Sequence, residues 1–169
     1  MNPIKLIYDK YENDLGIYYE EISEDIKDKD ILKTKILELL PEKINDEIIN
    51  KNKVFQIYTW GIKKTSGIDC DIIFDLTTFQ TKIDEDINIH TLNGFSKEIQ
   101  DSIILHPKFI EIIKKIVTLI EINNPRIVGF YCNHGKHRSV GWAEIIKKYY
   151  YNNAKIKHLC NPRKNTLKN

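Results

Sequence analysis

Cysteine is scarce in this sequence, and long apolar runs are missing. The 169 residues include three cysteines, Cys70, Cys132 and Cys160, whose spacings form no repeated pair. This pattern argues against a disulfide framework and against a Cys-rich zinc site. No apolar run approaches the length of a membrane span, and no N-terminal stretch has the layout of a signal peptide. We therefore expect an intracellular, cytoplasmic protein that makes no membrane contact.

Charge is present in both signs, but it is unevenly distributed. Residues 1–50 hold seven Lys against thirteen Asp or Glu, a net charge of −6, whereas residues 126–169 hold ten Lys or Arg against one Glu, a net charge of +9. A basic C-terminal quarter favours an anionic partner at that end. A solvated, Lys-rich face would give the same composition. The hydrophobic share of 41% indicates one ordinary globular core.

The order of apolar segments predicts an α/β protein. Residues 1–50 are interpreted as an acidic N-terminal extension, with a hairpin from 4–11 and 16–22 and a helix over 30–40 that Asp28 or Asp30 caps and Pro41 ends. Residues 51–169 form the main domain. Its expected strands are 54–60, 71–79 and 126–131, and its expected helices are 95–105, 107–123 and 139–153. Late alternation of strands with helices predicts a three-layer sandwich with a mixed, partly parallel sheet.

The stretch CNHGKHRS, residues 132–139, falls between a predicted strand and a predicted helix. A helix start offers unpaired N–H groups and a positive dipole end, which together bind anions. Gly135 allows close backbone approach, and Arg138 can bind two phosphate oxygens at once. The predicted phosphate site consists of Cys132, Asn133, His134, Gly135, Lys136, His137, Arg138 and Ser139, with Lys63 from the loop after the first strand of the main domain.

The same loop leaves a catalytic alternative open. The spacing Cys132-x5-Arg138-Ser139 matches the phosphate loop of cysteine-dependent phosphatases, in which a thiolate attacks phosphorus. A nearby helix start and cations favour a thiolate. The general acid would be Asp75, or else Asp69 or Asp71. A metal site is disfavoured because the cluster contains three cations and no acidic residue, so we expect neither a metal nor a cofactor.

Several segments in order resemble one protein family. CNHGKHRSV is similar to the CTGGxHRSV loop of the C-terminal domain of RapZ, the bacterial RNase adapter protein. VFQIYTWGIKK, GIDCDIIFDLTTF and TLNGFSKEIQDSII resemble further segments of that domain, so that the resemblance covers about residues 53–160. Asn133 and His134 replace the Thr-Gly of the family loop, and Thr77 takes the position of a family Arg.

The resemblance implies a binding module rather than an enzyme. It implies a pocket in the 132–139 loop and binding of small RNA or of a phosphorylated sugar by a regulatory adapter. No G-x-x-x-x-G-K-[ST] motif is present, so no ATPase is expected, and the chain resembles the C-terminal domain standing alone. The partners expected are RNA or a phosphorylated small molecule, a further protein and a second copy of the chain. Candidate contacts to the RNA backbone are Lys64, Lys147, Lys148, Lys155, Lys157, Arg163 and Lys164.

Overall fold

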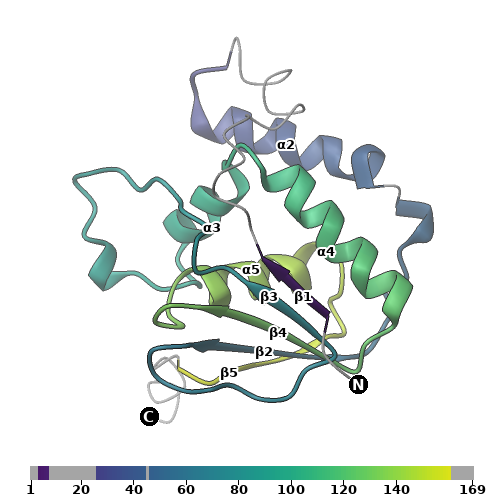
Figure 1. Ribbon diagram of the computed structural model, residues 1–169. Coiled ribbons are helices and arrows are strands. Elements are labelled where there is room, and N and C mark those ends of the chain that lie inside the picture. The colour runs from purple at the N-terminus through teal and green to yellow at the C-terminus, as the bar shows by residue number, and fades with distance from the viewer. Residues whose placement is uncertain (1–3, 8–25, 45, 161–169) are drawn as a thin grey trace, which may run out of the picture.

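A five-stranded parallel sheet forms the base of the molecule (Figure 1). The computed structural model describes residues 4–7, 26–44 and 46–160. The strands are β1 (Ile4–Ile7), β2 (Gln56–Gly61), β3 (Ile72–Asp75), β4 (Ile127–Cys132) and β5 (Lys155–His158), in the spatial order β1-β3-β4-β2-β5. The predicted α/β class is confirmed. All four pairs between these strands are parallel, whereas the sequence predicted a mixed sheet.

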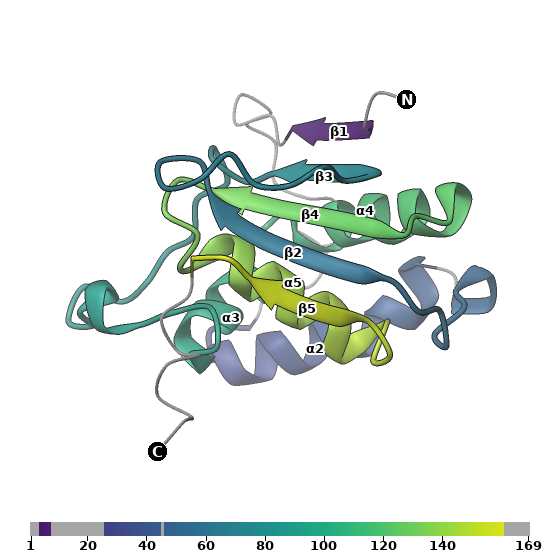
Figure 2. The same cartoon turned by 90° about the horizontal axis from the view of Figure 1, so that it is seen from below.

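The helices of the described residues lie on one face of the sheet (Figure 2). They are α2 (Lys29–Ile44), α3 (Lys97–Ile104), α4 (Phe109–Asn123) and α5 (Arg138–Tyr149), with short 3-10 turns at Asp46–Ile48 and Ile89–Thr91. Helix α2 packs on α3 and α4, on the side away from the sheet (Figure 1). The three layers are therefore the sheet, then α3 with α4 and α5, then α2.

The two faces of the sheet bury different amounts of apolar surface. Ile57, Phe74 and Phe130 point toward the helices and are at most 1% exposed, as alternation along each strand requires. On the opposite face, Trp60 stacks on Tyr131 in a small separate cluster with Cys70. The connection from β2 to β3 covers this cluster. It runs back across the sheet on the helix-free face, which the right-handed crossover rule requires for a connection in that direction.

Helix α2 begins as predicted but ends later. Asp28 caps it, since the Asp28 carboxylate accepts from the N–H groups of Asp30 and Ile31 at 2.9 and 3.1 Å. Pro41 lies inside the helix instead of ending it. Ile44, three residues later, is 1% exposed, and its burial favours one further turn despite the missing donor of Pro41. The predicted hairpin falls mainly on residues outside the described ones, and Ile4–Ile7 pairs with β3.

A buried polar chain fixes β5 against β2 and α5. The Thr59 hydroxyl and His158 Nδ1 are hydrogen-bonded at 2.7 Å, and His158 Nε2 donates to the Glu144 carboxylate at 2.8 Å. Because all three groups are paired, their burial costs little. In the part of the chain that the structure describes, no helix combines the length and the apolar character that crossing a membrane needs.

Candidate functional site

The loop between β4 and α5 sits at the carboxyl edge of the sheet, against the loop that follows β2. Ile62 N–H donates to Cys132 O at 3.0 Å, and Lys63 N–H donates to Asn133 O at 3.1 Å. Gly61 makes this approach possible, because a Cβ there would lie 2.2 Å from the carbonyl carbon of His134. Gly135 has φ of +70°, a conformation that favours glycine. The structure thus places Lys63 beside the loop.

Cys132 and Ser139 form the buried base of this loop. Cys132 is 2% exposed and Ser139 is fully buried. The N–H of Gly135 donates to Cys132 Sγ at 3.2 Å, and Ser139 Oγ lies 3.3 Å from the same sulfur. The loop therefore closes around the sulfur, which lies in its wall rather than on the surface.

Two of the side chains predicted to bind phosphate donate to backbone carbonyls instead. Lys136 Nζ donates to His90 O at 2.5 Å, and His137 Nε2 donates to Leu92 O at 2.9 Å. Burial holds the pKa of His137 below its ordinary value, with Lys136 and Arg138 adding to the effect, so the imidazole is neutral near pH 7. These bonds fix the loop to residues 89–92 and do not depend on any ligand.

Arg138 is likewise used within the fold. Its Nη1 donates to the carbonyl oxygens of Leu76, Thr77 and Phe79 at 3.0, 2.8 and 2.8 Å. The guanidinium thereby closes the turn that follows β3. A phosphate-binding role for Arg138 would have to use the other nitrogens of the group.

The three aspartates considered as a general acid lie apart from Cys132. Asp71 precedes β3 at the amino edge of the sheet, where it accepts from the N–H groups of Arg126 and Ile127, and the exposed Asp69 lies two residues before it. Asp75 is at the carboxyl edge, but it pairs in register with Tyr131, one residue before Cys132, so its side chain points to the opposite face. The Asp75 carboxylate accepts from Tyr131 Oη at 2.6 Å and from Thr77 Oγ1 at 2.7 Å.

The remaining predicted residues divide into two groups. Lys63, Lys64 and His134 are exposed and Asn133 is half-buried, all at the carboxyl edge. Helix α5 leads away from the loop, so that its last turn carries Lys147 and Lys148 toward the amino edge, where β5 begins at Lys155. The predicted basic end therefore does not continue the loop as one patch. Lys157 is exposed on β5, and Arg163 and Lys164 lie outside the described residues.

The sequence motifs did not predict the backbone carbonyls that bind the side chains of the loop. The carbonyls of residues 76–79 and 89–92 hold Arg138, Lys136 and His137, and a carbonyl has no signature in the sequence. Gly61, directly before the exposed loop, and Gly135 within the loop 132–139 were the sequence signals of close backbone approach. Among the described residues, no three His, Cys, Asp or Glu side chains are grouped as a metal site would need.

The structure is a parallel α/β domain in which the loop between β4 and α5 carries the candidate phosphate-binding residues. The sequence model of the RapZ C-terminal domain family matches residues 53–164, and the chain belongs to this family. It is 28% identical over 117 residues to a "Nucleotide-binding protein" of Thermosipho melanesiensis, and 31% identical over 99 residues to "Nucleotide-binding protein ZMO1325" of Zymomonas mobilis. A "Nucleotide-binding protein" of Agathobacter rectalis is 29% identical over 143 residues.

These alignments cover part of each protein. They include 64%, 53% and 78% of this chain and 42%, 30% and 48% of the three relatives, respectively. The chain thus spans less than half the length of each relative. The family match begins shortly before β2, so β1 and α2 lie outside it.

Proposed function

We propose that the loop 132–139 binds a phosphate group, on RNA or on a phosphorylated metabolite, and that the protein acts as a regulatory adapter. The observation that carries the proposal is the backbone bond from Lys63 to Asn133, which brings a second cationic loop beside the start of α5. The helix start, the positive φ of Gly135 and the exposed Lys63 and Lys64 all favour an anion there. Family membership and the names of the relatives support a phosphorylated ligand.

The test removes charge without removing a structural bond. Lys63 and Lys64 are exposed, so replacing both by Ala leaves the backbone contact to Asn133 in place. We expect binding of a short single-stranded RNA to weaken about tenfold and its salt dependence to become shallower. Inorganic phosphate should raise the melting temperature of the variant less than that of the parent.

A matched control removes the same charge elsewhere. Lys114 and Lys115 are adjacent and exposed on α4, and Lys114→Ala with Lys115→Ala should leave both binding measurements unchanged. Equal losses in the two double variants would show a general effect of net charge and would contradict a site at the loop. Unchanged binding in the Lys63 and Lys64 variant would do the same.

A cysteine-dependent phosphatase is a second candidate, favoured by the hydrogen bond from Gly135 N–H to Cys132 Sγ. The 2% exposure of Cys132 and the placement of Asp75 on the other face argue against it. The measurement is hydrolysis of an aryl phosphate by the parent and by Cys132→Ser. Turnover by the parent that disappears in the variant would make Cys132 a nucleophile. If neither protein hydrolyses the aryl phosphate, Cys132 is a structural residue at the base of the loop.

A further inference from the structure

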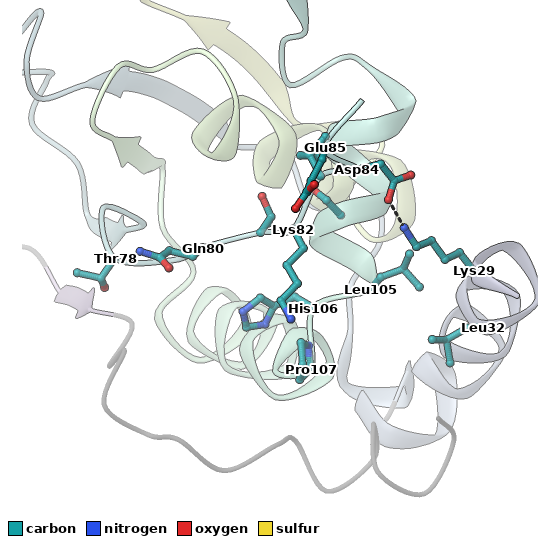
Figure 3. A pocket seen from close by; sticks show the side chains of 13 residues that line it. Lys29, Leu32, Thr78, Gln80, Lys82, Asp84, Glu85, Leu105, His106 and Pro107 are labelled. Carbon is teal, nitrogen blue, oxygen red and sulfur yellow. Dashed lines mark hydrogen bonds and ion pairs between the residues drawn. The ribbon is translucent and has the colours of Figure 1, made fainter. Parts of the chain in front are cut away.

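A cavity of about 800 Å³ lies between α2, the segment 78–85 and the junction of α3 with α4 (Figure 3). Small-molecule sites have volumes of about 300–1,000 Å³, so the cavity is of a suitable size. Its lining comes from residues 29–32, 78–85 and 102–107, and it is therefore separate from the loop 132–139. Because α2 lies outside the family match, one wall of the cavity is supplied by residues beyond the family domain.

The charges around the cavity cancel. Lys29 and Asp84 form an ion pair of 2.6 Å at one side, where Figure 3 shows them facing each other. Lys82 and Glu85 add one charge of each sign. A strongly charged ligand would meet both signs here, so the cavity suits an uncharged ligand better than a phosphate.

The uncharged lining offers both hydrogen bonds and apolar surface. Gln80 and Thr81 supply an amide and a hydroxyl, which can donate and accept. Leu32 and Leu105 supply apolar surface on the other side, opposite Thr78 and Gln80 (Figure 3). The ligand that matches this lining is small, has donors and acceptors at its edge and has apolar faces.

Three aromatic rings pack in a row that ends at the cavity with His106. The ring of His106 lies 4.4 Å from that of Phe79, and Phe79 in turn contacts Trp142 edge-on at 5.5 Å. Burial, with a smaller effect of Lys108, lowers the pKa of His106 to about 4, so that the imidazole is neutral near pH 7. A neutral, supported aromatic ring is a suitable platform for a planar heterocycle.

We propose that this cavity binds a nucleobase, carried either by a free nucleoside or by single-stranded RNA. A base has the flat faces, the polar edge and the lack of charge that the lining requires. Arg138 links the cavity to the loop, since it binds the carbonyls of Thr77 and Phe79, on either side of Thr78. The inference does not depend on phosphate binding, and the two can fail separately.

The test uses the two halves of a nucleotide as separate probes. Adenosine and uridine, which carry no phosphate, are titrated calorimetrically against the full chain, and inorganic phosphate is followed by melting temperature. Thr81→Trp fills the cavity from a loop and should weaken nucleoside binding by at least tenfold. Gln80→Ala, an exposed side chain whose loss should not impair folding, should weaken it about fivefold, the effect of one lost hydrogen bond. Both variants should keep the phosphate response of the parent.

The outcomes separate the two sites. No nucleoside binding by the parent, or binding that survives both cavity variants, overturns the base pocket and leaves phosphate binding at the loop standing. Nucleoside binding that is lost in Lys63→Ala with Lys64→Ala but kept in the cavity variants also overturns it. Nucleoside binding without any phosphate response supports the cavity and contradicts the proposed loop. A short single-stranded RNA that displaces the nucleoside identifies RNA as the source of the base, and one that does not identifies the free nucleoside.

Discussion

The two edges of the sheet carry charged residues of similar kinds and use them differently. At the amino edge, Asp71 joins β3 to β4 through two backbone N–H groups, and Lys53 donates to Asn124 at 2.8 Å. At the carboxyl edge, Arg138 is bound to three carbonyls, but Lys63 and Lys64 remain exposed beside it.

This comparison shows that membership of a motif does not decide whether a charge is available to a ligand. Arg138 is the fixed arginine of the phosphate-loop motif, but its Nη1 is bound to three backbone carbonyls of the fold. Lys63 belongs to no phosphate-loop motif, but the close approach of Gly61 to the loop places it beside residues 132–139. A folding role and a binding role can be separated by asking whether substitution changes stability or affinity.

Arg138→Ala should give the largest change. It leaves the carbonyls of Leu76, Thr77 and Phe79 without their shared donor, and charged hydrogen bonds in half-buried surroundings contribute about 2–3 kcal/mol. We expect the free energy of unfolding in urea to fall by about 3 kcal/mol. Lys136→Ala is the control. It removes one solvent-exposed bond from an ammonium group to a carbonyl, and because water can replace that donor we expect a loss of less than about 1 kcal/mol. Unchanged stability with complete loss of phosphate binding would instead make the guanidinium a ligand group.

The helices and strands of the main domain could be predicted from the sequence more fully than the roles of its side chains. The amphipathic pattern of 107–123 and the β-branched run of 126–131 predict α4 and β4 because their apolar residues bury directly in the core. The all-parallel sheet and the stacking of α2 on α3 and α4 depend on contacts between distant segments, which periodicity does not encode. Arg138, Lys136 and His137 were predicted as ligand-binding residues of one loop, but their carbonyl partners are set by the fold and have no signature in the sequence.

Asp71→Ala should have an intermediate effect at the opposite edge. The carboxylate accepts from Arg126 N–H at 2.8 Å and from Ile127 N–H at 2.9 Å, and these two bonds lower the pKa of Asp71. Because water can replace the carboxylate at this exposed position, we expect a loss of about 1 kcal/mol in urea unfolding and no change in phosphate or nucleoside binding. Asp69→Ala, two residues away and also exposed, is the control and should be neutral. A change in binding would contradict the purely structural role of the amino edge.

Asp75→Asn should give the smallest effect, and the size of that effect should depend on pH. Burial opposes ionisation of Asp75, but hydrogen bonds from Tyr131 and Thr77, with the charge of Lys5, outweigh it and hold the pKa of the carboxyl below its ordinary value of about 3.9. A carboxylate whose pKa is lowered by folding stabilises the native state above its unfolded pKa, and that contribution is lost as the pH falls through the folded pKa. The difference in unfolding free energy between the parent and Asp75→Asn should therefore be constant from about pH 6 to 8 and shrink below about pH 4. Asp69→Asn should show no such dependence. A difference that stays constant into acid would mean that the hydrogen bonds from Tyr131 and Thr77 do not need the charge of Asp75.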